Sequence, residues 1–230
     1  MKLPAPLFAG TLLRRYKRFL TDIERPDGSI ITAHTPNTGS MKQCAVPGYP
    51  VLFSAADNPN RKLPWTLELI QVGNDWVDTH TQRSNQLVAE ALVQGWITEF
   101  RDYQVRAECP YGGSRIDFLL TKGDDKVLLE VKNVTLCCEA TTACFPDAVT
   151  VRGQKHLLEL EKALCQGYRS VIFFLVQRSE ARCFSPADKI DPEYGRLLRQ
   201  VAAAGVEVLA YKTRTTPEEN RVVEKIAVRL

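Results

Sequence analysis

Two short segments, R-I-D-F at positions 115–118 and E-V-K at positions 130–132, decide how this chain is interpreted. Because side chains at positions i and i+2 of a strand point to one face, Glu130 and Lys132 share a face, and the residue between them points into a core. If the two segments pair as a hairpin, Asp117 joins them. Two carboxylates and an ammonium group on one face suit a hard divalent metal ion beside a cation that steers phosphate and water.

An ion-pair ladder on an exposed strand is the alternative interpretation of these three charges. The flanking sequence speaks against it, because F-L-L at 118–120 and V-L-L at 127–129 are nearly continuous apolar runs. Such runs predict strands that are buried on both faces. Buried charges are costly unless they are paired or bind a metal ion. We therefore predict a functional cluster.

The charge of the chain is distributed unevenly. The 230 residues are 44% hydrophobic and 25% charged, which allows one large or two small globular domains. Residues 1–62 contain nine lysines and arginines against four acidic residues, whereas residues 63–230 contain 21 against 23. A basic N-terminal region on a nearly neutral body favours an acidic polymer as partner.

Cysteine usage and hydropathy indicate the compartment. The seven cysteines lack the regular spacing of a secreted disulfide scaffold, and no segment approaches the ~18 apolar residues of a membrane span. We therefore expect a location in the reducing cytoplasm, with association with the nucleoid as one option, and no membrane partner. We expect Cys137, Cys138 and Cys144 to be unpaired buried thiols; zinc is the less favoured alternative, because no C-x2-4-C pair is present.

The chain divides near residue 80. Residues 1–80 contain five or six short strand candidates separated by turn signals, which predicts a small barrel of the five-stranded OB type. Residues 84–230 follow the order α-β-β-β-α-β-α-β, which predicts a mixed sheet flanked by helices. In this region Ser84 is the predicted N-cap of the first helix. Residues 135–151 are predicted to form a long loop, and residues 222–230 a final strand.

The second region resembles the PD-(D/E)XK (restriction-endonuclease-like) nuclease fold, whose core is αβββαβ. In that family, an aspartate on the second strand and an E-x-K on the third bind Mg²⁺ and position the attacking water. Asp117, Glu130 and Lys132 match these places, which implies catalytic roles for all three and metal binding by the two acids. Ile116 stands where the family name has proline. Glu90 matches a frequent helical acid of the family and is expected as a further metal ligand; a solvated helix residue is the alternative.

A narrower resemblance covers nearly the whole chain. The chain is similar to the sugar fermentation stimulation protein A (SfsA) family of bacteria. The matching segments are H-T-P-N-T-G-S-M at 34–41, R-I-D-F at 115–118, E-V-K at 130–132, F-P-D-A-V-T at 145–150 and R-G-Q-K-H-L at 152–157. The resemblance implies an N-terminal OB-like domain and a C-terminal nuclease-like domain. It also implies largely non-specific DNA binding and a regulatory role in the use of sugars, especially maltose.

Basic residues in three places are predicted to contact DNA. The run R-R-Y-K-R-F at 14–19 interleaves cations with aromatic rings, and two further cations follow at 61–62. Positions 152–156 open a helix, whose N-terminus favours phosphate. The predicted contacts are Arg14, Arg15, Lys17, Arg18, Arg61, Lys62, Arg152 and Lys155. Solvated surface residues are the alternative, since cations also protect exposed edge strands from aggregation.

Three further features keep two interpretations each. The loop at 34–41 is either a turn built on Pro-Asn and Thr-Gly or a contact with DNA or between domains. Asp147 is either an extra acid near the metal or, as we favour, a turn residue. His156 either assists the chemistry or is a satisfied core histidine.

Two functions remain open at this point. The first is a DNA-binding regulatory protein that uses the nuclease fold without cleavage, and the second is a working nuclease that depends on Mg²⁺ or Mn²⁺. A relic of the fold without any nucleic-acid role is disfavoured by the basic N-terminal region. We expect no small-molecule cofactor, because the sequence has no P-loop and no dinucleotide-binding fingerprint after a strand.

Overall fold

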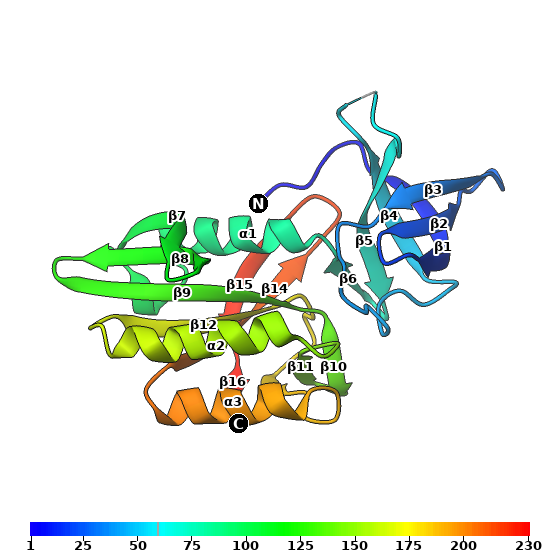
Figure 1. Cartoon of the computed structure of the whole chain (residues 1–230). Helices are drawn as coiled ribbons and strands as arrows, with labels where there is room; N and C mark the ends of the chain where they lie inside the picture. Colours follow the sequence, from blue (N-terminus) through cyan, green and yellow to red (C-terminus); the bar gives the residue numbers. More distant parts are fainter. Residues whose placement is uncertain (59) are drawn as a thin grey trace.

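The computed structural model describes residues 1–58 and 60–230, and the side chains within this part except that of Ser114. A β-barrel and a larger α/β domain lie side by side (Figure 1). The barrel contains the first six strands, which are β1 (Phe8–Tyr16), β2 (Leu20–Glu24), β3 (Ile30–His34), β4 (Pro50–Ala55), β5 (Trp65–Val72) and β6 (Asp75–Asp78). The α/β domain begins with helix α1 (Thr81–Val93).

The first domain is an OB-like five-stranded barrel. Its strands follow the order β3-β2-β1-β4-β5, with β6 added at the edge, and a parallel pairing of β3 with β5 closes the ring. Alternating apolar side chains such as Leu12, Ile23 and Phe53 fill the interior. A Cβ atom at Gly10 would lie 2.5 Å from Ile23 Cγ2, so this glycine lets β1 and β2 approach closely.

The second domain has a six-stranded sheet in the order β15-β14-β12-β9-β8-β7. Strands β9 and β12 are parallel, as are β12 and β14, whereas the hairpins β7/β8, β8/β9 and β14/β15 are antiparallel. The elements of this layer are a 3-10 turn η1 (Thr98–Phe100), β7 (Gln104–Tyr111), β8 (Ser114–Lys122), β9 (Asp125–Val134), α2 (Val151–Leu164), β12 (Arg169–Val176), α3 (Pro192–Ala203), β14 (Glu207–Thr215) and β15 (Asn220–Lys225). The predicted αβββαβ order is therefore present.

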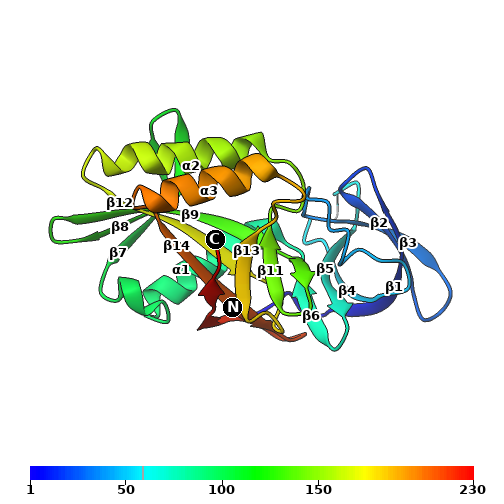
Figure 2. The same ribbon diagram turned by 90° about the horizontal axis from the view of Figure 1, so that it is seen from below.

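Helices cover both faces of this sheet. Helix α1 lies on one face, and α2 and α3 lie together on the other (Figures 1 and 2). Each face has its own apolar core, because side chains of the central strands alternate between the two sides. None of the described helices is long and apolar enough to cross a membrane.

The predicted long loop at 135–151 contains a hairpin, which corrects that prediction. Strands β10 (Leu136–Glu139) and β11 (Thr142–Phe145) pair with each other, and the sheet is extended by β13 (Cys183–Pro186) and β16 (Ala227–Val228). The predicted last strand is thus divided between β15 and β16. The hairpin brings Cys138 to Cys144 with a Cα–Cα distance of 5.8 Å, and the two form a disulfide. The expectation that both are free thiols is wrong.

Helix α1 begins earlier than the sequence predicts. Its first residue is Thr81 and its N-cap is His80, so Ser84 lies inside the helix and does not cap it. Ser84 is buried on the side of α1 that packs on the sheet. Helix α2 begins at Val151, and its cap is Thr150, whose side chain accepts a hydrogen bond from the Gly153 amide at 3.0 Å.

The first residues of the chain belong structurally to the second domain. The Leu3 amide donates to the Glu218 carbonyl at 2.9 Å, Lys2 forms a β-bridge with Glu219, and the amino group of Met1 donates to the Asn220 carbonyl at 2.8 Å. The chain then runs into the barrel and returns through β6 (Figure 1). The barrel is therefore joined to the second domain at both of its ends.

Candidate functional site

The three charged residues of the R-I-D-F and E-V-K segments meet where β8 and β9 separate. The antiparallel register between these strands ends at the pair Phe118 and Leu129. One position further, the Oδ2 atom of Asp117 accepts a hydrogen bond from the Val131 amide at 2.8 Å. A side-chain bond thus replaces the next backbone pairing, and the opening between the strands leaves room for a cavity.

The Glu130 carboxylate contacts two side chains on its side of the sheet, Lys132 and His156. Lys132 Nζ lies 2.7 Å from Glu130 Oε1, and Nδ1 of His156 on α2 also bonds this oxygen. Arg152 Nε donates to His156 Nε2 at 3.4 Å. Lys132 Nζ also lies 3.2 Å from His156 Nδ1, so Glu130, Lys132 and His156 form one connected cluster.

The second oxygen of Glu130 has no such partner. Glu130 is 3% exposed, and its Oε2 atom has no hydrogen-bond partner among the residues that the structure describes. An unpaired oxygen of a buried carboxylate is costly unless a ligand completes it. The site therefore retains binding capacity for a cation or a proton donor.

The two carboxyl groups have opposite pKa shifts. Burial, and then the charge of Glu130, raise the pKa of Asp117 to about 6. Burial also tends to raise the pKa of Glu130, but the hydrogen bond from His156 and the charge of Lys132 outweigh it and hold this pKa below its ordinary value. A divalent cation would relieve the repulsion between the two groups and favour ionised Asp117.

These residues line a cavity of about 220 Å³ that opens to solvent. Its walls contain Asp117, Glu130, Lys132, Asn85, Val131, Phe145, Thr150, Arg152, Gly153 and His156. Arg152 is exposed in the first turn of α2, so its guanidinium group is available at the mouth. The cavity therefore combines buried carboxylates with an accessible cation and a helix N-terminus.

Glu90 does not belong to this cavity, which corrects its prediction as a metal ligand. Its Oε2 atom pairs with the amino group of Met1 at 2.7 Å. Asn85 occupies the side of α1 that faces the site, and its Nδ2 atom donates to Asp117 Oδ1 at 2.7 Å. Within residues 1–58 and 60–230, no group of three or more His, Cys, Asp or Glu side chains is arranged to hold a metal ion.

The donors that are present fit a hard divalent cation in part. Two carboxylates lie in one cavity, one of their oxygens is unpaired, and the pKa of Asp117 reflects their repulsion. Oxygen donors of this kind are those that Mg²⁺, Mn²⁺ and Ca²⁺ prefer, and Mg²⁺ usually completes its coordination with water. Glu90, the further ligand expected from the sequence, does not reach this cavity.

Helix α1 is fixed in place by a buried ion-pair network. Arg83 donates to Asp78 Oδ1 at 2.9 Å and also pairs with Glu68 of the barrel. All three side chains are nearly inaccessible to solvent. Because the partners come from β5 and β6, this network connects the barrel to the helix that carries Asn85.

The basic run at the end of β1 is divided between two environments. Arg14 is exposed and pairs with Asp22 Oδ2 at 2.7 Å. Arg15 is half-buried, and its guanidinium group donates to the carbonyl oxygens of Asn37, Gly39 and Ser40 at 2.7–3.1 Å. Burial lowers the pKa of Arg15 from its ordinary value. Arg15 thus holds a loop in place, and we withdraw it as a predicted phosphate contact.

The other predicted DNA contacts remain accessible, at different places. Lys17 and Arg18 are exposed in the turn between β1 and β2, and Lys62 is exposed before β5. Arg61 donates to Thr66 Oγ1 at 2.9 Å and lines a groove at the domain junction. Lys155 is exposed on α2 and is not among the residues that line the cavity; its Nζ atom lies 3.5 Å from Glu159 Oε1. The structure therefore groups only Arg152 with the carboxylates.

The loop at 34–41 forms a contact between the domains. The carboxylate of Asp147 accepts hydrogen bonds from Ser40 Oγ and from the Met41 amide, both at 3.1 Å. A Cβ atom at Gly39 would lie 2.8 Å from Asp147 Oδ2, so glycine permits this approach. Asp147 therefore acts neither as an extra acid of the site nor as a simple turn residue.

Sequence reasoning missed Asn85 and left His156 undecided. Asn85 could have been noticed as an amide beside the apolar stripe of a helix, but its partner Asp117 is 32 positions away. His156 is buried and bonded to Glu130, so both of its interpretations hold in part: it is satisfied, and it adjoins the site.

Comparison with known proteins agrees with this architecture. A family model described as the SfsA N-terminal OB domain matches residues 13–78, and another described as the sugar fermentation stimulation protein RE domain matches residues 82–219. SfsA of Pyrococcus furiosus, whose structure is described as a complex with Ca²⁺, superimposes with a TM-score of 0.89. It is 26% identical, and the match covers 100% of both chains.

Two curated relatives are closer in sequence. A sugar fermentation stimulation protein homolog of Syntrophotalea carbinolica is 60% identical over 228 residues, which cover 99% of each chain. The homolog of Geobacter sulfurreducens is 52% identical over 230 residues, covering 99% of this chain and 98% of the relative. With both domains matched and identity above half along nearly the full length, this chain belongs to the sugar fermentation stimulation protein (SfsA) family.

Proposed function

We propose that this chain binds nucleic acid and hydrolyses its phosphodiester bonds with the help of a divalent metal ion. The observation that carries the proposal is the meeting of Asp117, Glu130 and Lys132 in one cavity, with Glu130 Oε2 unpaired among the described residues. Mg²⁺ and Mn²⁺ bind to such oxygen donors. The P. furiosus relative is described in complex with Ca²⁺, which is a hard divalent cation of the kind proposed here.

Each side chain of the cavity has a distinct part in this proposal. Asp117 and Glu130 would hold the ion, which when bound supplies Lewis acidity toward a phosphate and an attacking water. Lys132 orients that water and balances the negative charge that develops on the phosphate. Arg152 binds a phosphate oxygen at the N-terminus of α2. His156 keeps Glu130 in position through its Nδ1 hydrogen bond.

Exposed cations of the barrel extend the proposed interface. Lys17, Arg18, Lys62 and, at the domain junction, Arg61 offer positive charge without a base-reading helix in the described chain. Binding should therefore be mainly electrostatic, weakly dependent on sequence, and steeply weakened by salt. A nucleic-acid partner in turn favours a cytoplasmic location.

The test is cleavage of labelled DNA and RNA substrates in single-stranded, duplex and branched form, with Mg²⁺ or Mn²⁺. Wild type is compared with Asp117→Asn and with the matched control Glu90→Gln. Glu90 is an acid of α1 that lies outside the cavity, so its variant should cleave as wild type does. Asp117→Asn should abolish cleavage while the fold survives. Cleavage that persists in Asp117→Asn would overturn the proposed site.

A second function is favoured by one feature of the cavity. Both Lys132 and His156 bond to Glu130 Oε1, which weakens Glu130 as a metal ligand. In this second proposal the chain binds DNA without cutting it and regulates genes of sugar use, maltose among them. The names of the curated relatives refer to the stimulation of sugar fermentation and to nothing more. Salt-sensitive DNA binding without cleavage of any substrate in the panel would favour it.

A further inference from the structure

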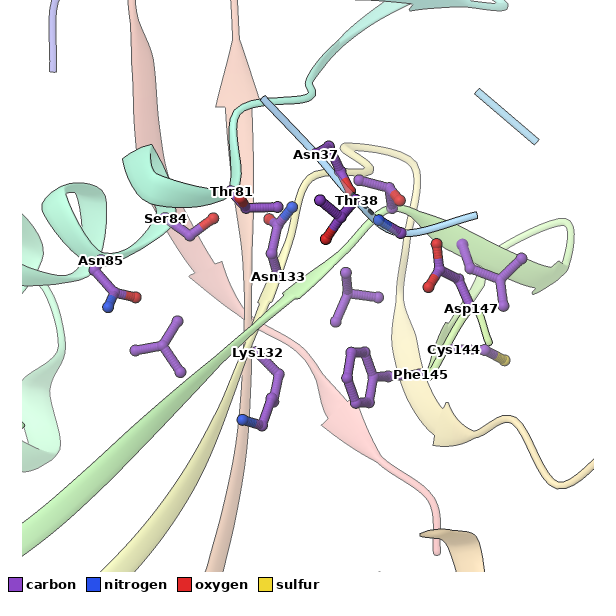
Figure 3. Close-up of a pocket in the computed structure, with 15 residues that line it drawn as sticks. Asn37, Thr38, Thr81, Ser84, Asn85, Lys132, Asn133, Cys144, Phe145 and Asp147 are labelled. Carbon is purple, nitrogen blue, oxygen red and sulfur yellow. Dashed lines mark hydrogen bonds between the residues drawn. The ribbon is translucent and has the colours of Figure 1, made fainter. Parts of the chain in front are cut away.

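A second cavity, of about 250 Å³, lies directly beside the candidate catalytic site. The two cavities share Asn85, Val131, Lys132 and Phe145, so strand β9 runs along both. Figure 3 shows side chains converging on this cavity from the loop at 34–41, from the start of α1 and from β9. Its walls therefore come from both domains.

The cavity is polar but nearly uncharged. Of the described residues that line it, Lys132 and Asp147 are the two with charged side chains. Lys132 is paired with Glu130, and the Asp147 carboxylate accepts hydrogen bonds from Ser40 and Met41. A phosphate would require free cations, and a metal ion would require free carboxylates. The lining therefore suits a neutral polar ligand.

The cavity contains a buried hydroxyl group without a partner. Ser84 is 1% exposed, and its Oγ atom has no hydrogen-bond partner in the described part of the chain. Leaving such a group unpaired costs on the order of 1–3 kcal/mol. A ligand that supplies the missing hydrogen bond would recover this cost.

In each of three asparagines of the cavity, either the side-chain oxygen or the side-chain NH₂ group is hydrogen-bonded within the protein. Asn37 Oδ1 accepts from the Gly39 amide at 2.8 Å, and Asn133 Oδ1 accepts from Gln177 Nε2 at 3.0 Å. Asn85 instead donates its Nδ2 to Asp117. Among the described residues this leaves two NH₂ groups as donors and one carbonyl oxygen as acceptor, all on side chains that line the cavity.

We propose that this cavity receives one unpaired nucleobase of the strand whose phosphate lies at Asp117, Glu130 and Lys132. The inference rests on the proposed nucleic-acid function and deepens it. Base edges present mixed donors and acceptors, and carboxamides are side chains that read them. Phe145, shared by both cavities, adds an aromatic surface of the kind on which bases stack.

The substrate class follows from the position of the cavity. A base within a duplex is paired and stacked, so it enters an enclosed site only when it is extruded at a cost of a few kcal/mol. Single-stranded nucleic acid, or a strand with a displaced base, is therefore the preferred substrate. Arg15 is a positioning residue for this site, because it binds the carbonyls of Asn37 and Gly39 and so fixes the loop.

The experiment compares three labelled 12-nucleotide probes by fluorescence anisotropy in Ca²⁺: a single strand, its duplex, and a strand of abasic spacers with the same phosphates. Wild type should bind the single strand about tenfold more tightly than the spacer strand, as expected for one well-bonded base. Ser84→Ala combined with Asn133→Ala should reduce this ratio to about twofold. Affinity for the spacer strand should not change, which also shows that the variant is folded.

Gln86→Ala, an exposed substitution on α1, is the matched control and should keep the tenfold ratio. Ser84→Ala alone, a change of one oxygen atom, should lower the ratio partway. Equal wild-type affinity for the single strand and the spacer strand overturns the base pocket and leaves nucleic-acid binding intact. Equal loss for both probes in the double variant also overturns it. Absence of salt-sensitive binding to every probe overturns both this inference and the proposed function.

Discussion

The charged cluster on β8 and β9 and the basic run at the end of β1 use their charges differently. In the cluster, residues from separate strands share one cavity, and one oxygen of Glu130 stays unpaired within the described chain. In the run, Arg14 pairs with Asp22 while its neighbour Arg15 binds loop carbonyls. Neighbours along a strand point to opposite faces, so a run is divided between environments. In the cluster, by contrast, charged side chains from several strands meet in one cavity, where an oxygen that is unpaired among the described residues can still bind a ligand.

The largest effect should come from removing the cation of the cluster. We expect Lys132→Ala to lower the single-turnover cleavage rate about 10²–10³-fold, because a preorganised group that acts on developing charge is lost. Metal affinity, measured by titration calorimetry, should change less than about threefold. Lys126→Ala, an exposed lysine of the same strand, is the control and should leave both quantities unchanged. Equal losses of cleavage and metal affinity would refute a separate role for Lys132.

In the basic run, mutations should differ in their effect on the free energy of unfolding. Arg15→Ala should lower the free energy of unfolding by about 2–3 kcal/mol, because the loop carbonyls lose charged donors in a half-buried place. Arg14→Ala should lower it by much less, since the Arg14 side chain is exposed and Asp22 keeps its hydrogen bonds from Thr32 and Tyr16. Urea denaturation measures both. Similar losses in the two variants would show that the half-buried Arg15 does not stabilise the fold more than the exposed Arg14.

Asp117 should make the free energy of unfolding depend on pH. The pKa of Asp117 is about 6 in the folded protein, above the ordinary value of about 4, so the folded state binds the proton more tightly. Stability from this group is therefore present below about pH 4 and is lost as pH rises to about 6. Asp117→Asn should remove this loss and raise the free energy of unfolding at pH 7 by about 3 kcal/mol.

The comparison is made between wild type and variant at each pH, so that other titrating groups cancel. Asp124→Asn, in the exposed turn between β8 and β9, is the control and should follow wild type. At pH 7, Mg²⁺ should raise the melting temperature of wild type and not that of Asp117→Asn. A variant that is less stable than wild type at pH 7 would contradict the assigned repulsion between Asp117 and Glu130.

The smallest effect should be on the salt dependence of DNA binding. Lys17→Ala with Arg18→Ala removes two exposed cations and should reduce the slope of log affinity against log salt by up to about 2. Arg14→Ala should reduce it by less than about 1, because Asp22 already neutralises this residue. Identical slopes in wild type and the double variant would exclude the turn of the barrel from the interface.

The sequence predicted best what depends on short-range periodicity. Alternation along β9 placed Glu130 and Lys132 on one face, where the structure has them 2.7 Å apart. The sequence did not predict which side of helix α1 faces the opening between the strands. Positions 85 and 90 differ by about 140° around a helix axis, so only one of the two can face the sheet opening. The sequence does not show where β8 and β9 separate, and this separation selects Asn85.

Long-range partners explain the other differences. Arg15 meets carbonyl groups 22–25 positions away, which no local pattern indicates. The hairpin of β10 and β11 has strands of four residues, and it is extended by β13 and β16 from much later in the chain. Short strands of this kind are stable only with their neighbours. The segment at 135–151 therefore shows no strand signal of its own.

The pairing of residues 1–3 with Glu218 and Asn220 affects the order in which parts of the protein can fold during synthesis. The amino group of Met1 and the Asn220 carbonyl are separated by 219 positions, so these contacts close a loop of nearly the whole chain. Closing long loops slows folding, because the entropy of the chain is lost before the contacts form. During translation the barrel can fold early, whereas its first anchor waits for β15. The contacts of Arg83 with the barrel need only residues 68–83, whereas the contacts of residues 1–3 need residues 218–220.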